Sequence, residues 1–463
     1  MTSEGDRGGR WDPDSPPVAA GERVRLVVER LVAGGDGLAR RAGQVVFVPA
    51  TAPGDEALVD IDEVHRSYAR GHLVEVLRPG PGRVRPRCPL VGECGGCQWQ
   101  HLDYPTQLAA KTELVAEALR RVGKLDVPVA PCRPAPDPWR YRAKAQLPVA
   151  GQGAQLVLGP YRRGTHQVVD APTCPIQAAD NDRVLAAVRR VLTALGVPAY
   201  DEASGSGVVR HVLVRSAGPG QVVVVLVTAV DSWSEAPRVA RRLRQEAPDL
   251  VGVLQNVQPL RTNRVLGPVS RVLVGRSDLT EHLGGLALRA EATSFFQVHP
   301  AAADLLFALA VTEADVHPDD VVTDLYCGAG ALTLLLAQRA ARAVGVEVDD
   351  RAVAAARANA VANGIANAVF LAGRVEDTLA ALPEPPTVVT LDPPRAGAGA
   401  AVMRAVAALG PRRVVYVSCN PVTLARDLAA LVATGFAVAH ALPVDMFPQT
   451  AHVEVVARVD RAP

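Results

Sequence analysis

The chain has 463 residues, of which 49% are hydrophobic and 21% are charged, so it is long enough for roughly three domains with packed cores. A formal net charge of +1 excludes a basic field over the whole molecule as the means of binding a polyanion. Its basic residues are almost all arginines, which suit bidentate contacts with phosphate, and the lysines are Lys111, Lys124 and Lys144.

The sequence gives only weak signals for secretion, membrane insertion or disulfide formation. Residues 1–20 are polar, rich in glycine and proline, and lack the apolar stretch of a secretory signal. The longest apolar run, residues 222–230, is far too short to cross a bilayer and resembles a buried strand. Seven cysteines are an odd number, which does not favour a disulfide framework. We therefore expect a cytoplasmic protein that does not insert into a membrane.

The N-terminal part is predicted to be a short tail followed by a small barrel. Residues 1–17 have the composition of a disordered tail. Short strand-like segments separated by glycines come next, and their spacing predicts a β-barrel over residues 18–78. A cluster of breakers, residues 78–82, marks its end. The strand-like segments are 24–28, 44–49, 57–61 and 72–77.

A central α+β domain is predicted over residues 79–283. An apolar stripe from Leu108 to Val122 indicates a helix that Gly123 would end. Later, two apolar segments, residues 208–215 and 221–227, have the length and composition of paired strands.

Strands and helices alternate over residues 284–463, which predicts an α/β, Rossmann-like domain with a parallel doubly wound sheet. An antiparallel pair, expected at 444–447 and 452–459, would close the sheet. The predicted parallel strands are 321–325, 343–347, 388–391 and 413–417, and the first two helices are 331–339 and 351–363.

A glycine loop follows the first of these strands. Asp324, Gly328 and Gly330 stand between a strand and a helix, where glycines let the backbone approach a ligand closely. The third glycine of the dinucleotide fingerprint is absent. Glu347 ends the next strand, about 20 residues further on, at a position suited to a ribose diol. The pattern predicts a nucleoside site, and a purely structural turn is the alternative.

Two further strands end in residues capable of chemistry. Asp392, before two prolines, ends the fourth strand, and Cys419 ends the fifth, at the edge where open α/β sheets bind ligands. Residues 420–421 open a helix whose dipole is expected to lower the thiol pKa. Glu454, in an apolar strand, is either solvent-facing or functional. A turn aspartate and an inert buried cysteine are the ordinary alternatives, and we read Cys132 and Cys327 as structural.

Four other cysteines have the spacing of a metal site. Cys88, Cys94 and Cys97 lie among prolines and glycines, and Cys174 follows far downstream. Zinc sites usually show two close Cys-x2-Cys pairs, so an iron–sulfur cluster is favoured over zinc. Basic stretches containing aromatic residues flank these cysteines. Each alone is typical of a solvated surface, but together they predict an RNA-binding face, and they are residues 83–87, 139–144 and 161–163.

Together these segments resemble the RNA uracil-C5 methyltransferases, in particular the bacterial 23S ribosomal RNA branch that carries a TRAM domain and a 4Fe–4S cluster. The resemblance covers nearly all of residues 20–460. It rests on segments 88–111, 294–297, 325–330, 345–347, 391–395, 417–427 and 445–454.

The resemblance implies a fold, a cofactor and roles for particular residues. The barrel would be an OB-like TRAM domain, S-adenosylmethionine the methyl donor, Cys419 the nucleophile that adds to uracil C6, and Glu454 the general base. His299 departs from the family pattern, where asparagine is expected. The implied donor-site residues are Gln297, Tyr326, Gly328, Glu347 and Asp392, and the implied cluster ligands are Cys88, Cys94, Cys97 and Cys174.

We therefore expect a monomeric enzyme that forms 5-methyluridine in 23S ribosomal RNA, on a single-stranded or loop uridine flipped out of its stack. A transfer RNA uridine methylase of the same chemistry is the nearest alternative. A radical methylthiotransferase would also pair a TRAM domain with a cluster, but its cluster needs Cys-x3-Cys-x2-Cys, and this chain has Cys-x5-Cys-x2-Cys. A non-catalytic RNA-binding module is the third alternative.

Overall fold

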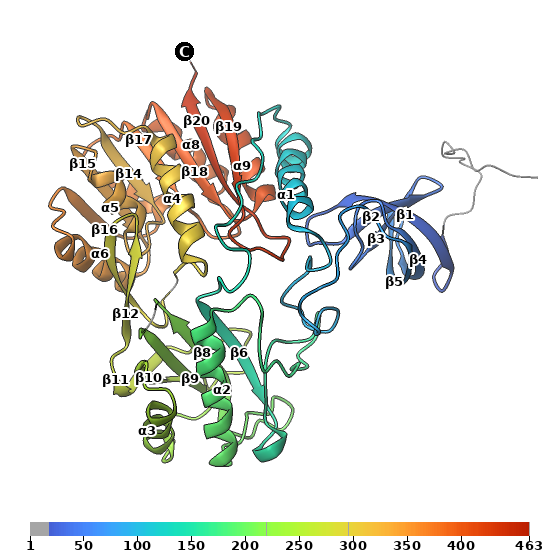
Figure 1. The fold of residues 1–463 in the computed structure, drawn as a ribbon. Helices are drawn as coiled ribbons and strands as arrows, with labels where there is room; N and C mark the ends of the chain where they lie inside the picture. Colours follow the sequence, from blue (N-terminus) through green and yellow to red (C-terminus); the bar gives the residue numbers. More distant parts are fainter. Residues whose placement is uncertain (1–17, 219, 295, 463) are drawn as a thin grey trace, which may run out of the picture.

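The computed structural model describes residues 18–218, 220–294 and 296–462, so the tail predicted at 1–17 lies outside the described residues. A small barrel stands to one side, joined by extended segments to a central sheet and to a larger α/β body above that sheet (Figure 1). Within these ranges, no helix has the length and apolar character needed to cross a bilayer.

The N-terminal barrel is closed, in the order β1-β2-β3-β5-β4, as the sequence predicted. Alternate residues of β1 are buried, so one face of each strand fills the barrel core and the other meets solvent. The strand β2 was not predicted because it is short and ends in two arginines. The bounds are β1 Arg23–Leu31, β2 Gly37–Arg41, β3 Gln44–Val48, β4 Glu56–Val64 and β5 Tyr68–Arg78.

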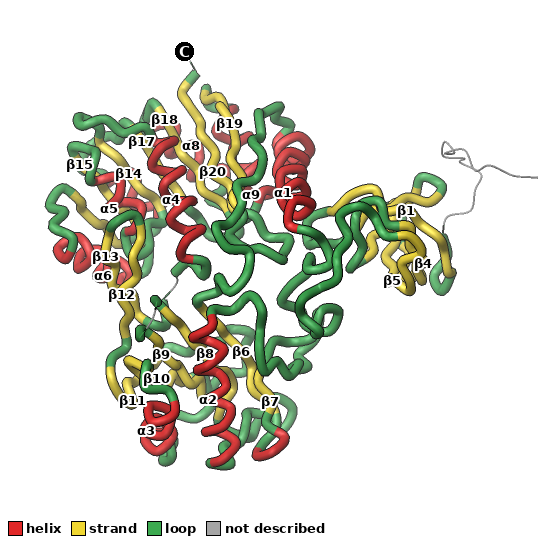
Figure 2. The backbone as a smooth tube through the Cα atoms, in the orientation of Figure 1, coloured by secondary structure: helices red, strands yellow, loops and turns green. Residues whose placement is uncertain are grey.

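The central domain is built on a six-stranded sheet, in the order β11-β10-β9-β8-β6-β7. Helices α2 and α3 pack on it through a cluster of valines and leucines, and β9 is buried along its whole length, as expected for this apolar run (Figure 2). The bounds are β6 Lys144–Ala150, β7 Val157–Leu158, α2 Ala179–Ala194, β8 Val209–Ser216, β9 Val222–Thr228, α3 Ala236–Glu246, β10 Leu250–Val257 and β11 Val269–Gly275.

The C-terminal domain has a seven-stranded sheet, in the order β16-β15-β14-β17-β18-β20-β19. The first five strands are parallel, and β20 pairs antiparallel with both β18 and β19, so the predicted doubly wound sheet with an antiparallel closing pair is confirmed. The closing strands themselves lie at 436–444 and 454–461, so the expected strand at 444–447 is wrong. The strand bounds are β14 Val321–Leu325, β15 Arg342–Glu347, β16 Ala368–Ala372, β17 Val388–Leu391, β18 Arg413–Ser418, β19 Phe436–Val444 and β20 Glu454–Arg461.

Helices cover both faces of this sheet. Successive residues of a strand face opposite layers: Val388 packs with α4 and α5, whereas Val389 packs with α8 and α9. A hairpin of β12 and β13 precedes α4, and the domain boundary proposed at 283/284 falls in its turn. The bounds are β12 Asp278–Leu283, β13 Leu286–Glu291, α4 Pro300–Ala314, α5 Ala331–Ala337, α6 Asp350–Ala362, α7 Val375–Thr378, α8 Ala400–Ala408 and α9 Pro421–Val432.

Helix α1, Tyr104–Ala118, is the predicted amphipathic helix, and a π-helical turn, Leu119–Gly123, extends it to a left-handed Lys124 (φ 54°). Val115 packs with α9 and β19, so α1 belongs to the core of the C-terminal domain although it precedes the central sheet. Its buried face also contains Gln107 and Lys111, which the apolar stripe did not include.

Candidate active site

The predicted nucleophile and base lie on neighbouring strands. Cys419 directly follows β18, and Glu454 is the first residue of β20. The two strands are antiparallel, with Ser418 opposite Val455, so the end of one meets the start of the other. Asp392 follows β17 on the other side of β18. Three residues far apart in sequence therefore reach one edge of the sheet.

Buried acidic groups dominate the electrostatics of this edge. Burial raises the pKa of Asp392 to about 7, and burial together with the charge of Asp392 raises the pKa of Glu454 well above its usual range. Burial, together with the charges of Glu454 and Asp392, raises the pKa of the Cys419 thiol to about 11. The expected lowering of the thiol pKa is therefore wrong for the protein without substrate, although α9 begins at Pro421 as predicted.

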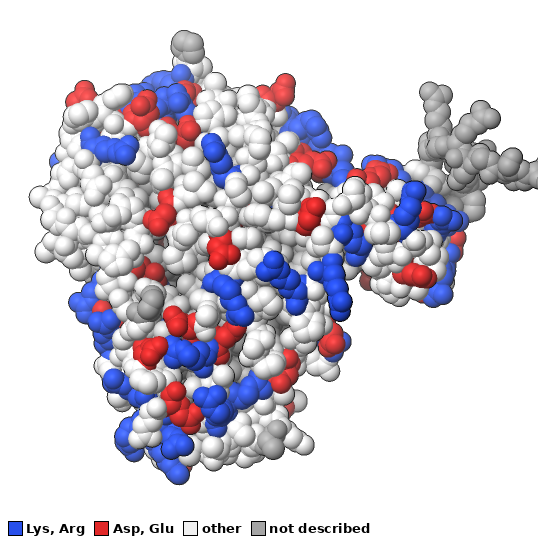
Figure 3. Space-filling model, in the orientation of Figure 1, with Lys and Arg blue, Asp and Glu red and all other residues white. Residues whose placement is uncertain are grey.

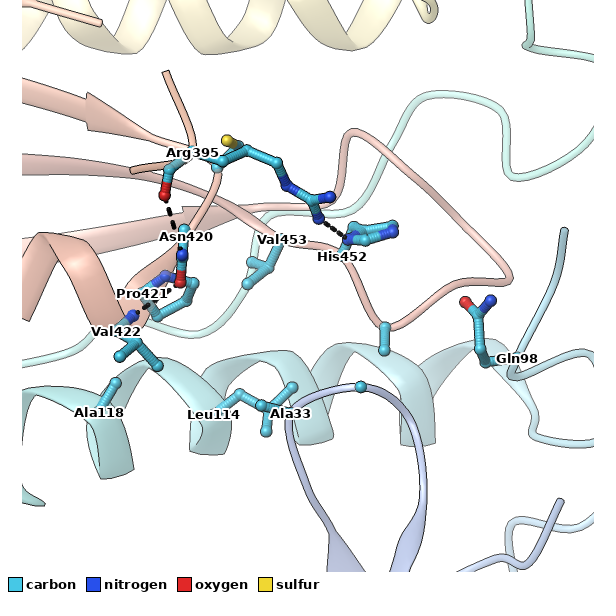
Figure 4. A pocket seen from close by; sticks show the side chains of 13 residues that line it. Ala33, Gln98, Leu114, Ala118, Arg395, Asn420, Pro421, Val422, His452 and Val453 are labelled. Atoms are coloured by element: carbon cyan, nitrogen blue, oxygen red, sulfur yellow. Dashed lines mark hydrogen bonds between the residues drawn. The ribbon is translucent and has the colours of Figure 1, made fainter. Parts of the chain in front are cut away.

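Arg395 provides the positive charge at this edge. Its guanidinium opposes the rise in pKa of both Cys419 and Glu454. It donates a hydrogen bond to Nδ1 of His452 (3.0 Å), and its backbone carbonyl accepts one from Nδ2 of Asn420 (3.0 Å) (Figure 4). The sequence analysis gave Arg395 and His452 no role, although each stands within three residues of a predicted site residue.

The glycine loop faces the end of β15. The backbone N–H of Gly328 donates to the Glu347 carboxylate (3.1 Å), which also accepts from the N–H groups of Val348 (2.8 Å) and Asp349 (3.0 Å). Tyr326 has a left-handed backbone (φ 61°), and so has Gly328 (φ 55°). A Cβ built on Gly328 would meet no atom within 4 Å, so the backbone of the loop is open on that side.

Asp324 holds this loop rather than facing a ligand. Its carboxylate is 2% exposed and accepts hydrogen bonds from the hydroxyls of Thr333 (2.6 Å) and Thr390 (2.7 Å). It thereby ties β14 to the first turn of α5 and to β17. Burial raises its pKa to about 6, and the two hydroxyls oppose that rise.

The four cysteines of the predicted cluster come together from distant segments. All are partly buried free thiols. Burial raises the pKa of Cys97 to about 12, and the charges of Cys174, Cys94 and Cys88 add to the rise, so the four sulfurs lie within electrostatic reach of each other. In the described parts of the chain, no three His, Cys, Asp or Glu side chains are arranged to hold a single metal ion.

Comparisons with known proteins agree with this architecture. Residues 386–461 match the family described as tRNA (Uracil-5-)-methyltransferase, residues 17–74 the TRAM domain, and residues 322–391 a methyltransferase domain. An uncharacterized RNA methyltransferase of Bacillus cereus is 36% identical over 96% of this chain and 98% of its own. A counterpart in Gloeobacter violaceus is 39% identical over 96% and 97%.

One solved structure matches nearly the whole fold. The tRNA (uracil-54, C5)-methyltransferase of Pyrococcus abyssi, in complex with S-adenosyl-L-homocysteine, superposes with a TM-score of 0.76 and 25% identity, over 94% of this chain and 99% of its own. The chain belongs to the RNA uracil-5-methyltransferase family. It is therefore an S-adenosylmethionine-dependent enzyme with a class I methyltransferase fold and a TRAM domain.

In this uracil-5-methyltransferase, the segment before α4, which contains the predicted donor-site residue Gln297, contacts the central domain. Gln297 is half-buried next to the start of α4. His299 caps that helix by accepting from the Ala302 N–H (3.4 Å), and its other ring nitrogen lies 3.0 Å from the Asp137 carbonyl. The ring also stacks on Tyr141 (4.6 Å between centroids). The residue that departs from the family pattern thus performs the capping expected of asparagine.

The loop that precedes Glu454 packs against α1 of this methyltransferase. Lys111 and Asp445 form an ion pair, and both side chains are fully buried. One turn earlier in α1, Gln107 donates to the Gln449 side chain (3.1 Å) and accepts from the Gln449 backbone (2.9 Å). These contacts were missed because polar residues in a helix usually face solvent.

Proposed function

We propose that this enzyme methylates C5 of a uridine in 23S ribosomal RNA, with Cys419 as nucleophile and Glu454 as general base. One observation carries the assignment: the thiol and the carboxyl group stand at adjoining ends of hydrogen-bonded strands, beside Asp392. A ring at this edge can meet a nucleophile and a base that belong to the same rigid sheet.

The chemistry follows from the weak nucleophilicity of uracil C5. Cys419 adds to C6, which forms the S–C6 bond, breaks the C5–C6 double bond and leaves an enolate. C5 of the enolate takes the methyl group, whose bond to the donor sulfur breaks. Glu454 removes the proton from C5, the S–C6 bond breaks, and the ring regains its double bond with the thiolate as leaving group.

Cys419 needs help to ionise, because its pKa is raised to about 11. Arg395 is the nearby cation that favours the thiolate, and its hydrogen bond to His452 orients the guanidinium. A hydrogen bond from Asn420 fixes the Arg395 backbone from the other side. We assign Arg395 the role of stabilising the thiolate in the bound complex.

We place the donor between the glycine loop and Asp392. S-adenosylmethionine supplies a methyl group on a positively charged sulfur. Glu347 would bind the ribose hydroxyls, and Gln297 and Asp392 would face the methionine part and the reacting methyl. The open space beside Gly328 fits such a ligand, as do the oriented carboxylate of Glu347 and the aromatic side chain of Tyr326.

We further propose that Cys88, Cys94, Cys97 and Cys174 hold a 4Fe–4S cluster, which would add electron-transfer capacity or rigidity to this segment. The proposal is supported by the donor set: four free thiols within electrostatic reach, three of them on a segment with several glycines. Gly96 donates its N–H to the Cys94 sulfur (3.3 Å), the kind of hydrogen bond that tunes cluster ligands.

Transfer RNA is the second candidate substrate, because the matched family and the Pyrococcus abyssi enzyme both bear that name. The cysteine set supports the ribosomal branch by the resemblance, whereas the barrel does not discriminate, because the Pyrococcus abyssi enzyme matches 94% of this chain. Mapping 5-methyluridine across ribosomal and transfer RNA in a strain lacking the gene decides between them. A site lost only from 23S ribosomal RNA, and restored by the purified protein, supports the proposal, whereas loss only from transfer RNA replaces it.

Covalent trapping tests the chemistry. RNA with 5-fluorouridine at the mapped site should form an adduct with the wild type that survives denaturation, because fluorine does not leave as a proton does. We expect Cys419→Ala to lose the adduct and methylation but retain donor binding, since the donor loop is separate. Cys132→Ala, at a buried cysteine outside the site, is the control and should still be trapped. An adduct with Cys419→Ala would refute the assignment.

A further inference from the structure

A cavity of about 300 Å³ adjoins Cys419, a volume at the lower end of ordinary ligand sites. Cys419 and His452 line one end, but neither Glu454 nor Asp392 does. The cavity extends past Val422 to α1 and to a turn of the TRAM barrel. Arg395 and Val453 also line it. Because the target ring must reach Glu454, which does not line this cavity, the cavity borders the place of that ring.

Three parts of the chain form its walls. Figure 4 shows Leu114 and Ala118 of α1 on one side, Pro421 and Val422 of α9 on the other, and Ala33 of the barrel between β1 and β2. These side chains are apolar or small, and Val422 is 44% exposed although it is apolar. Such a surface suits the face of a planar ring.

The barrel turn is held in place by its neighbours. Gly35 has a left-handed backbone (φ 96°), and a Cβ there would lie 2.9 Å from Cβ of Gln98. The Gly35 carbonyl accepts a hydrogen bond from the Trp99 indole (3.0 Å). By contrast, Gly34 and Ala33 are exposed on the cavity side, and a Cβ on Gly34 would meet nothing within 4 Å. The turn is thus rigid at its base and open at its tip.

Gln98 forms part of the wall and is held in place. Its amide nitrogen donates to the Gly95 carbonyl (3.1 Å), which fixes the orientation of the amide, and its Oε1 is buried away from solvent. Lys and Arg side chains lie in a row across the middle of the molecule, where the domains meet (Figure 3).

We propose that this cavity binds the base of a nucleotide next to the target uridine, splayed out of the RNA stack between the TRAM turn and α1. The inference rests on the proposed function, because the occupant is continuous with a uridine bound at Cys419. A flipped target leaves its neighbours unstacked, and apolar walls recover part of the lost stacking. The TRAM domain would then complete the substrate site.

The test uses the 5-fluorouridine RNA with an abasic residue at the position before or after the target, and follows the rate of adduct formation at subsaturating RNA. For the wild type, one of the two abasic RNAs should react on the order of tenfold more slowly than the intact RNA. Ala33→Phe fills the cavity from an exposed turn and should bring this ratio close to one. Ala20→Phe, the same change at the other end of β1, should leave the ratio unchanged.

Equal rates for all three RNAs with the wild type, or an unchanged or larger ratio with Ala33→Phe, would overturn the subsite. Failure of the intact RNA to form any adduct would instead count against the proposed function. The two failures are therefore distinguishable in one set of reactions.

Discussion

Glu454 is a buried acid whose side chain is 4% exposed, and its replacement should separate two steps of the reaction. In Glu454→Gln the amide does not accept the C5 proton, so methyl transfer should proceed and elimination should stop. We expect enzyme covalently joined to methylated RNA to accumulate, detectable by mass spectrometry after denaturation. Recovery of only free, unmodified RNA would place Glu454 in binding or folding.

The buried carboxyl group of Asp392 also predicts that donor binding releases protons. Asp392, with a pKa of about 7, is roughly half protonated at pH 7 in the free protein. A cation bound nearby lowers a carboxyl pKa, so S-adenosylmethionine should release protons on binding. S-adenosylhomocysteine has no charge on its sulfur and should release fewer. Calorimetry at pH 7 in buffers of different ionisation enthalpy measures the number of protons released by each ligand. Equal proton release by the two ligands would contradict the proposed donor position.

Some residue positions followed from sequence and others did not. Asp392 and Cys419 were expected at one edge because the carboxyl ends of adjacent parallel strands meet there. The sequence left open whether Glu454 points to solvent or into the site, because alternation in an apolar strand does not show which face holds a functional acid. The direction of the Cys419 pKa shift was not predicted, because the burial of the thiol and the nearness of two carboxyl groups, which outweigh the dipole of α9, appear only in the fold.

At the scale of elements, β19 shows why the closing pair was misplaced. Its alanines and Pro443 are poor strand formers, whereas residues 444–447, three of which are apolar, resemble a strand. Because β19 is the edge of the sheet, Pro443 is tolerated there. By contrast, β14 and β17 were placed at their observed bounds, since short β-branched runs between turns have few alternatives.

The contact between α1 and the loop before β20 predicts a stability effect. Lys111→Met should leave the buried Asp445 charge without its partner, at a cost of about 3–5 kcal/mol. The unfolding midpoint should fall by on the order of 10 °C. The double variant Lys111→Met/Asp445→Asn should recover much of this loss, and Lys124→Met, at an exposed lysine, should change little. A midpoint for Lys111→Met equal to that of the wild type would show that the pair does not hold the loop.

At the scale of the molecule, the cysteine-rich segment joins all three domains. Trp99, two residues after Cys97, donates its backbone N–H to the Gln449 carbonyl (3.0 Å) and its indole N–H to the barrel. On the central side, Gly95 donates to the Tyr161 carbonyl (3.0 Å). A cluster at this point would fix the relative positions of the RNA-binding surfaces within one monomer.

Anaerobically purified protein should therefore be brown and contain about four irons per chain. Cys97→Ser should lower RNA affinity more than donor affinity, because the donor site lies on other loops. Cys132→Ala is the matched control and should retain the iron. Zinc without iron would refute the cluster, and unchanged RNA affinity in a folded, iron-free variant would show that the cluster does not organise the RNA surface.

The placement of Glu454 on β20, next to β18, has a consequence for how this scaffold can change. Hydrogen-bonded neighbouring strands lie about 4.8 Å apart, and the register of Ser418 with Val455 sets the span between nucleophile and base. That span is a property of the backbone ladder, not of loop conformation. Variants selected to act on a different nucleobase should therefore accumulate changes in the loops around Arg395 and His452. The register of the two strands should stay the same, because it sets a distance that suits a six-membered ring.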